Sequence, residues 1–195
     1  MMRSSTIERT TGETTIDCTL DIDGKGGFAG NTGIGFFDHM LNLFAKHGDL
    51  SLEMTCSGDL YVDTHHSVED MGIVLGTCLK TALGDKRGIK RYGNFYCPMD
   101  EALTRTTLDL SGRGYLVFNV DLTREKVGDF ETEMLKEFLY AFAINSGTTL
   151  HVNTLYGSND HHIIESIFKS LGRALKEAVS IDKDSNEIPS TKGML

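Results

Sequence analysis

Two copies of one short motif constrain this chain more than any other feature of its sequence. The segments His65-His66-Ser67-Val68-Glu69 and His161-His162-Ile163-Ile164-Glu165 share the pattern HHxxE and lie 96 positions apart. The similarity continues downstream, where LGTCLK (75–80) and LGRALK (171–176) agree at four of six positions. Upstream of each motif, residues 50–54 and 148–152 alternate in the manner of strands. The sequence therefore predicts two copies of one structural unit.

Each unit is predicted to consist of strand, helix, strand and helix. In the first unit we expect strands at 14–23 and 49–55, a helix at 36–46 ending at Gly48, and a helix at 64–83. Asp63 or Thr64 is the expected N-cap of that second helix, with Gly84 beyond its end. In the second unit we expect strands at 102–110, 115–121 and 148–155, and helices at 131–145 and at 160–179, the latter capped near Asn159.

The strands begin in hairpins and are followed by helices, which favours an α+β fold. Each half would be a sheet covered on one face by two helices, and pairing the halves would bury the second faces of the helices. The expected boundaries are a first repeat at 1–84, a linker at 85–93, a second repeat at 94–179 and a polar tail at 180–195.

The HHxxE motif at the start of a helix is suited to metal binding. At about 100° per residue, His65 and Glu69 lie roughly 40° apart and one turn apart, so they can bind one ion. His66 points about 100° away and is expected to serve a different ion. The same reasoning applies to the second copy. Two such helices could build two mixed sites, each with a His–Glu pair from one helix and a single histidine from the other.

Three further histidines remain. His39 lies at the start of a predicted helix, His151 lies in a predicted strand, and His47 lies at a helix end, where a protonated imidazole is favoured. If His39 and His151 complete the set, each ion has three histidines and one glutamate. Such open N/O sites suit Mn²⁺, Fe²⁺ or Co²⁺ better than a closed structural zinc. A lone HH pair is usually a surface feature, but two copies at matched positions favour metal binding.

The composition excludes several other classes. A formal charge of −9 at pH 7 argues against nucleic-acid binding, which needs a net basic face. No apolar run approaches the ~20 residues that span a bilayer, and the N-terminus lacks the apolar core of a signal peptide. The four cysteines (18, 56, 78 and 97) lie far apart without a CxxC motif, which indicates reduced thiols. We therefore expect a cytoplasmic protein.

Several residues could hold an anion. Their combination with a metal site suggests a phosphate ligand, because lysine and arginine side chains, a serine hydroxyl and backbone N–H groups can all bind phosphate. They are Arg91, Arg113, Lys169, Ser190 and Lys192.

Together these segments resemble the imidazoleglycerol-phosphate dehydratase family, from about residue 7 to the C-terminus. The residues that carry the resemblance are Phe37-Asp38-His39-Met40-Leu41, Asp63-Thr64-His65-His66-Ser67-Val68-Glu69-Asp70, Leu83-Gly84-Asp85-Lys86-Arg87-Gly88-Ile89, Pro98-Met99-Asp100-Glu101-Ala102-Leu103, Asp109-Leu110-Ser111-Gly112-Arg113, Leu150-His151 through His161-His162-Ile163-Ile164-Glu165 to Phe168-Lys169, and Pro189-Ser190-Thr191-Lys192-Gly193.

The resemblance implies a fold of two ribosomal-protein-S5-domain-2-like halves, with helices inside and sheets outside. It implies two Mn²⁺ ions per active site, a homo-oligomer of 24 subunits with sites between subunits, and dehydration of imidazole glycerol phosphate to imidazole acetol phosphate in histidine biosynthesis. The implied metal ligands are His39, His65, His66, Glu69, His151, His161, His162 and Glu165.

The resemblance also implies roles for residues around the substrate. Phosphate would be bound by Arg91, Arg113, Lys169, Ser190 and Lys192. Glu13 matches a family glutamate placed at the substrate, and we expect it to act as an acid or base. Leu43 stands where many family members have glutamine. Two other functions stay open on the residues alone: a di-metal phosphate-ester hydrolase, and a non-catalytic metal-binding protein.

Overall fold

The structure is a computed structural model that describes residues 3–182 and 185–195. Residues 1–2 of the expected first repeat and 183–184 of the expected tail lie outside the described residues. The first half comprises β1 (Ser4–Thr10), β2 (Thr14–Asp21), β3 (Gly27–Asn31), α1 (Gly35–Gly48), β4 (Ser51–Gly58) and α2 (His65–Leu83). The second comprises β5 (Tyr92–Met99), β6 (Ala102–Asp109), β7 (Tyr115–Asn119), β8 (Lys126–Val127), β9 (Phe130–Glu131), α3 (Met134–Ser146), β10 (Thr149–Tyr156) and α4 (Asp160–Val179).

The two halves have the same topology, which confirms the duplication. The first sheet has the order β1-β2-β4-β3 and the second β5-β6-β10-β7. In each sheet the last pair is parallel, β3 with β4 and β7 with β10, and the other pairs are antiparallel. The short hairpin β8–β9 has no counterpart among the described elements of the first half.

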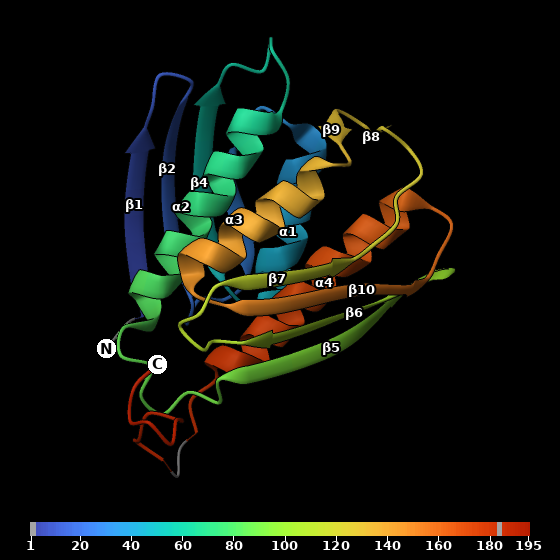
Figure 1. Cartoon of the computed structure of the whole chain (residues 1–195). Helices are drawn as coiled ribbons and strands as arrows, with labels where there is room; N and C mark the ends of the chain where they lie inside the picture. Colours follow the sequence, from blue (N-terminus) through green and yellow to red (C-terminus); the bar gives the residue numbers. More distant parts are fainter. Residues whose placement is uncertain (1–2, 183–184) are drawn as a thin grey trace.

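The helices form the inner layer of the molecule (Figure 1). Helix α2 contacts β1 and β2, and α4 contacts β5 and β6. Across the middle, α2 packs on α3 and α1 packs on α4, so each helix pair joins the two halves. The expected α+β fold with helices inside and sheets outside is confirmed.

Alternation along the strands explains why each sheet has one covered face. In β2, Thr14, Ile16, Cys18 and Leu20 are buried against the helices, while the residues between them face outward. β6 repeats this pattern with alternate buried and half-buried residues. A side-chain period of two places one set of residues in the core and the other at the surface.

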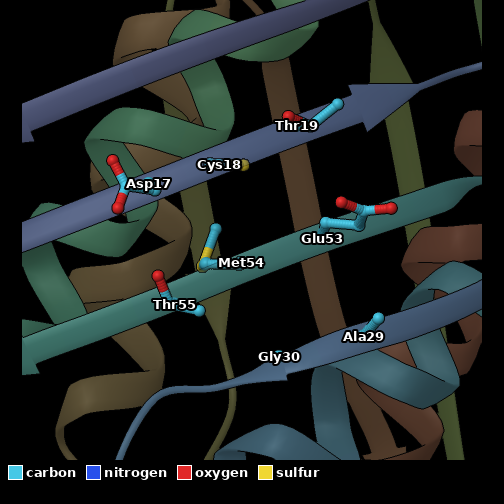
Figure 2. A pocket seen from close by; sticks show the side chains of 8 residues that line it. All are labelled: Asp17, Cys18, Thr19, Ala29, Gly30, Glu53, Met54 and Thr55. Carbon is cyan, nitrogen blue, oxygen red and sulfur yellow. The ribbon is translucent and has the colours of Figure 1, made fainter.

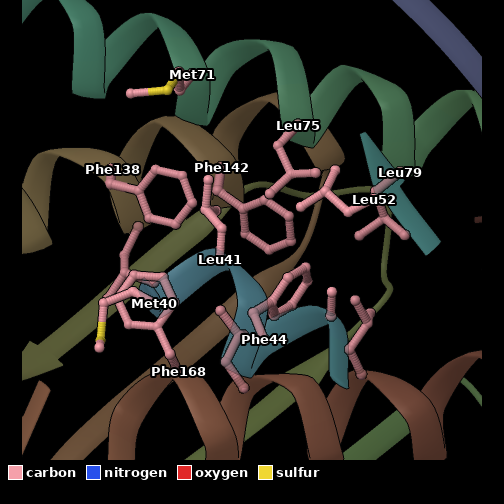
Figure 3. Close-up of a cluster of buried hydrophobic side chains, with 14 of the residues drawn as sticks. Met40, Leu41, Phe44, Leu52, Met71, Leu75, Leu79, Phe138, Phe142 and Phe168 are labelled. Carbon is pink, nitrogen blue, oxygen red and sulfur yellow. The ribbon is translucent and has the colours of Figure 1, made fainter. Parts of the chain in front are cut away.

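The core is shared by both halves. Phe37 of α1 meets Phe138 of α3 edge to face, with ring centroids 5.0 Å apart, and Phe138 stacks on Phe168 of α4 at 5.7 Å. Figure 3 shows these helices interleaving their side chains with Met71 and Leu75 of α2. Because one cluster includes all four helices, neither half has a core of its own.

Glycine lets the helix pairs approach closely. A Cβ atom at Gly76 of α2 would lie 2.6 Å from the carbonyl oxygen of Phe142 on α3. A Cβ atom at Gly172 of α4 would lie 2.5 Å from that of Phe44 on α1. Any larger side chain at either position would push the helices apart.

The structure differs from the sequence predictions at several ends. Glu131 was expected to begin a helix but lies in β9, and α3 begins at Met134. Gly48 is the last residue of α1, and Asp49 adopts the left-handed conformation at its end. β1, β3 and β5 were not predicted, and β5 begins at Tyr92, inside the segment expected as a linker. None of the helices described here is long and apolar enough to cross a bilayer.

Candidate metal centre

The second HHxxE motif opens α4, as the sequence predicted. The side chain of Asn159 accepts a hydrogen bond from the backbone N–H of His161 at 3.0 Å, which makes it the expected N-cap. The buried carboxylate of Asp160 accepts hydrogen bonds from the backbone N–H groups of Thr123 and Arg124, at 2.9 and 2.7 Å. The start of the helix is therefore anchored on both sides.

Three ligand atoms converge at this helix start. Nε2 of His161 lies 3.3 Å from Oε2 of Glu165, one turn later. His39 reaches the same place from α1, and the ligand atoms of His39, His161 and Glu165 all lie within 4.8 Å of one another. Glu165 is buried, His161 is half-buried and His39 is exposed. Two imidazoles and a carboxylate suit a divalent transition-metal cation such as Mn²⁺, Fe²⁺, Co²⁺ or Zn²⁺.

Glu165 is held as a carboxylate. Burial raises its pKa, but the ion pair with Lys169 and the nearby imidazoles of His39 and His161 outweigh that effect and leave the pKa below its usual value. The Lys169 ammonium lies 2.5 Å from Oε1 of Glu165. Lys169, expected at a phosphate, is thus paired with a candidate metal ligand in this chain.

The first HHxxE motif opens α2 but has a smaller set of neighbours. Nε2 of His65 lies 3.4 Å from Oε2 of Glu69, and both side chains are more than 40% exposed. Among the described residues, the group of His39, His161 and Glu165 is the one in which three potential ligands come together. The pair of His65 and Glu69 therefore has no third ligand close by in the described part of this chain.

His66 and His162, the second histidines of the two motifs, share a different arrangement. Nδ1 of His66 lies 3.0 Å from Oδ2 of Asp59, and Nδ1 of His162 lies 2.7 Å from Oε2 of Glu101. These hydrogen bonds raise the pKa of both imidazoles. The bond to His162, together with two backbone N–H groups, lowers the pKa of Glu101 to about 2. The other nitrogen of each ring, Nε2, faces away from the carboxylate that binds Nδ1.

Glu13 lies beside the first motif. Its Oε1 atom is 3.7 Å from Nε2 of His66, and the side chain is half-exposed. In the second half, Oδ2 of Asp100 lies 3.7 Å from Nε2 of His162. Asp59, Asp100 and Glu101 were not among the predicted site residues. The internal repeat could have pointed to Glu101, because Glu101 directly precedes β6 in the same way that Glu13 directly precedes β2.

A hairpin of the second half anchors two helices of the first. Asp129, between β8 and β9, accepts hydrogen bonds from the backbone N–H groups of Gly35 and Phe36 at the start of α1, at 2.6 and 2.9 Å. Glu131 accepts hydrogen bonds from the N–H and hydroxyl groups of Thr64, at 3.1 and 2.6 Å, directly before His65. Long-range contacts therefore fix the helix starts that carry the histidines.

His151 lies apart from these residues. It pairs with Thr107 and Val117 in the middle of the second sheet and is exposed, while its neighbours Leu150 and Val152 are buried against the helices. Its side chain therefore faces away from the helix layer.

The corresponding face of the first sheet is hollowed at β2, β3 and β4. There Glu53 and Asp17 border a shallow pocket of ≈320 Å³ (Figure 2). This hollow contains none of the predicted site residues.

Most of the expected phosphate residues lie at the other end of α4. The guanidinium of Arg91 binds the carboxylate of Asp109 at 2.7 and 3.1 Å and donates a hydrogen bond to the carbonyl of Pro189, next to Ser190. The backbone N–H of Arg91 donates to Ala178, near the C-terminal end of α4.

At 1.5 Å per residue, Ala178 lies about 25 Å along the helix from His161. Figure 1 shows the tail at that end of the molecule. Arg113 is exposed in the turn after β6, and Lys192 donates its N–H to the Ser190 hydroxyl at 3.2 Å. Apart from Lys169, the expected phosphate residues therefore lie far from the candidate metal ligands within one chain.

Comparisons with known proteins agree with one another. The imidazoleglycerol-phosphate dehydratase family profile matches residues 32–175. The chain is 57% identical to the imidazoleglycerol-phosphate dehydratase of Oceanobacillus iheyensis and 58% identical to that of Caldanaerobacter subterraneus, in both cases over 100% of each chain.

Solved structures lead to the same family. The Staphylococcus aureus imidazoleglycerol-phosphate dehydratase superposes with a TM-score of 0.84 at 42% identity, covering 92% of this chain and 99% of that one. The Pyrococcus furiosus enzyme, solved in complex with (S)-C348, superposes with a TM-score of 0.83 at 36% identity. The match covers 97% of this chain and 100% of that one.

Proposed function

Because this chain belongs to the imidazoleglycerol-phosphate dehydratase family, and so is a dehydratase, we propose that it removes water from imidazole glycerol phosphate to give imidazole acetol phosphate, as a step of histidine biosynthesis. The observation that carries the metal-dependent part is the convergence of His39, His161 and Glu165 within 4.8 Å. Such a donor set suits one Mn²⁺ ion, and the matching pair of His65 and Glu69 in the first motif leads us to propose a second Mn²⁺ ion in each active site. Free cysteines, buried or half-buried, are in keeping with a cytoplasmic enzyme.

The candidate ligands of these ions are the residues of the two motifs with two added histidines. They are His39, His65, His66, Glu69, His151, His161, His162 and Glu165. When bound, Mn²⁺ supplies positive charge that lowers the pKa of a coordinated water or imidazole nitrogen.

The protein's own acid–base group is Glu13. The proton to be removed lies on a carbon beside the imidazole ring of the substrate, which has no carbonyl to accept the charge. The half-exposed carboxylate of Glu13, next to His66, can take a proton from the substrate side chain and return one to the leaving hydroxyl. Arg91, Arg113, Lys169, Ser190 and Lys192 would hold the phosphate through charge-assisted hydrogen bonds.

One copy of the chain does not assemble this site. His65 and Glu69 lack a third ligand among the described residues, His151 faces outward, and the tail lies far from the metal ligands. We therefore infer a homo-oligomer, of 24 subunits as in the related family, in which sites form between subunits. Neither nucleic acid nor a membrane has a role in this proposal.

The direct test follows ketone formation from imidazole glycerol phosphate, with metal-free enzyme and after adding Mn²⁺. Ketone that depends on Mn²⁺ supports the proposal, and no ketone from metal-loaded enzyme would refute it. Release of inorganic phosphate instead would identify a phosphate-ester hydrolase. Glu13→Gln should keep metal binding but lower turnover by roughly 10²–10⁴-fold. Glu8→Gln, an exposed change on the same hairpin, is the matched control.

Shared sites are tested by mixing two inactive variants, His151→Asn and Glu165→Gln. If each site takes these two residues from different chains, random co-assembly should restore about a quarter of wild-type activity. Sites built within one chain would stay inactive in the mixture. Light scattering of the same samples gives the number of subunits.

A further inference from the structure

In each motif a carboxylate orients the second histidine, but the two carboxylates are of different types and come from different places in their halves. An imidazole can ligate a metal through Nε2 only when that nitrogen carries no proton, and the hydrogen bond made by Nδ1 decides which nitrogen is protonated. An ionised carboxylate can only accept, so the N–H of each ring must lie on Nδ1, toward Asp59 in one half and Glu101 in the other.

We propose that Asp59 and Glu101 are positioning residues that hold His66 and His162 in the tautomer whose Nε2 is free to bind metal. This inference rests on the metal sites of the proposed function.

The repeat explains why the two carboxylates come from different places. Glu13 and Glu101 occupy matching positions, each directly before the second strand of its half. In the second half, Glu101 is used on Nδ1 of His162. In the first half, Asp59, which follows β4, takes the Nδ1 position. Glu13 is thereby left on the Nε2 side of His66, where its carboxylate is half-exposed.

The two carboxylates differ in their other contacts, and this makes the proposal testable. Glu101 uses Oε1 to accept hydrogen bonds from the backbone N–H groups of Ser158 and Asn159, at 3.2 and 2.8 Å, and Oε2 for His162. Among the described residues, His66 is the one hydrogen-bond partner of the Asp59 carboxylate, with both oxygens within 3.3 Å of Nδ1.

An amide in place of each carboxylate therefore acts differently. In Glu101→Gln, the two backbone donors keep the amide oxygen on their side, because turning it would forfeit both hydrogen bonds. The NH₂ group then faces Nδ1 of His162 and forces the proton onto Nε2. In Asp59→Asn, the amide is free to turn its oxygen toward Nδ1 of His66, and the metal-binding tautomer is kept.

The experiment titrates metal-free enzyme with Mn²⁺ and follows the EPR signal of the free ion. We expect Glu101→Gln to weaken one class of sites by about 10–100-fold. Asp59→Asn should weaken binding by less than about threefold, because a neutral acceptor remains. A role limited to holding the loop before α4 predicts wild-type binding for Glu101→Gln, since both backbone N–H groups keep their acceptor.

A double-mutant cycle shows whether Glu101 acts through His162. In a His162→Ala background, Glu101→Gln should cause no further loss of affinity. A full further loss, equal effects of the two amide variants, or unaltered binding in Glu101→Gln would each overturn the proposal. A wild-type enzyme without Mn²⁺ sites would instead refute the proposed function itself.

If Glu101→Gln does not fold, the wild-type enzyme still answers the question. Ring ¹⁵N shifts of histidine, assigned to His162 by difference from His162→Ala, report which nitrogen carries the proton. A protonated Nδ1 with a bare Nε2 in metal-free enzyme at alkaline pH supports the proposal, and the reverse overturns it.

Discussion

Replacing Glu131 by glutamine tests whether the hairpin of the second half stabilises the start of α2. The Glu131 carboxylate accepts two hydrogen bonds from Thr64 and lies 2.9 Å from the ammonium of Lys126. The hydrogen bonds with Thr64 and the charge of Lys126 lower its pKa to about 2. Because Thr64 directly precedes His65, the same contact positions the first motif.

The size of the effect follows from these contacts. A fall in pKa from 4.5 to about 2 sets an upper limit of ~3 kcal/mol, at about 1.4 kcal/mol per pH unit. The ion pair contributes less than about 1 kcal/mol, because Lys126 is 58% exposed. Glutamine keeps one acceptor for Thr64. We therefore expect Glu131→Gln to lower the free energy of unfolding by about 1–2 kcal/mol at pH 7.

The pH dependence distinguishes a charge effect from a packing effect. The pKa of Glu131 is lower in the folded chain, so its stabilisation is complete above pH 4.5 and is lost as the pH falls toward 2. Urea unfolding at several pH values and a fixed protein concentration should show the gap between wild type and variant closing in acid. A gap that does not change with pH would refute this reasoning. So would an equal loss in Glu125→Gln, an exposed change nearby.

Three further outcomes are expected. Gly76→Ala places a methyl group against a carbonyl of α3 and should lower the free energy of unfolding in urea by about 1–3 kcal/mol. Gly27→Ala, where the added methyl group meets open space, should change the free energy of unfolding by less than about 0.5 kcal/mol. Lys169→Met removes the ammonium partner of the buried carboxylate of Glu165 and should destabilise the metal-free protein by about 2 kcal/mol, against less than about 1 kcal/mol for the exposed Lys176→Met. Removing metal with a chelator should abolish ketone formation until Mn²⁺ is returned; activity that survives would contradict a metal-dependent reaction.

Local patterns predicted the parts of this fold that local forces determine. The bounds of α4 and its cap at Asn159 agree with the sequence prediction, because periodicity and capping are set within a few residues. The repeat predicted two halves with equal topology. Glu131 shows the limit: a good helix former was expected in a helix, but it pairs with Lys126 in the β8–β9 hairpin, and its side chain accepts hydrogen bonds from Thr64.

The sequence predicted candidate ligands but not their arrangement. The spacing of HHxxE correctly brings His161 to Glu165, and the fold adds His39. The carboxylates of Asp59 and Glu101 were missed: Glu101 lies 61 residues from its partner His162, and Asp59, 7 residues before His66, lies in a loop that periodicity does not describe. The separation of His151 from the other candidate ligands was also missed, because it depends on which face of a sheet a strand residue occupies.

Comparing the two halves explains why the two HHxxE motifs have unequal surroundings within one chain. With α1 and α3 aligned from their C-terminal ends, Phe44 and Phe142 match and are both buried, as are Leu41 and Leu139. Outside the core the residues differ, and His39 is matched by Glu137. Packing of the shared core demands apolar residues at equivalent positions in both helices, but it places no such demand on surface positions. The duplication therefore supplies two His–Glu turns and only one α1-type histidine. In the proposed oligomer, the third ligand for His65 and Glu69 would be His151 of a second copy, because this residue faces outward in its own chain.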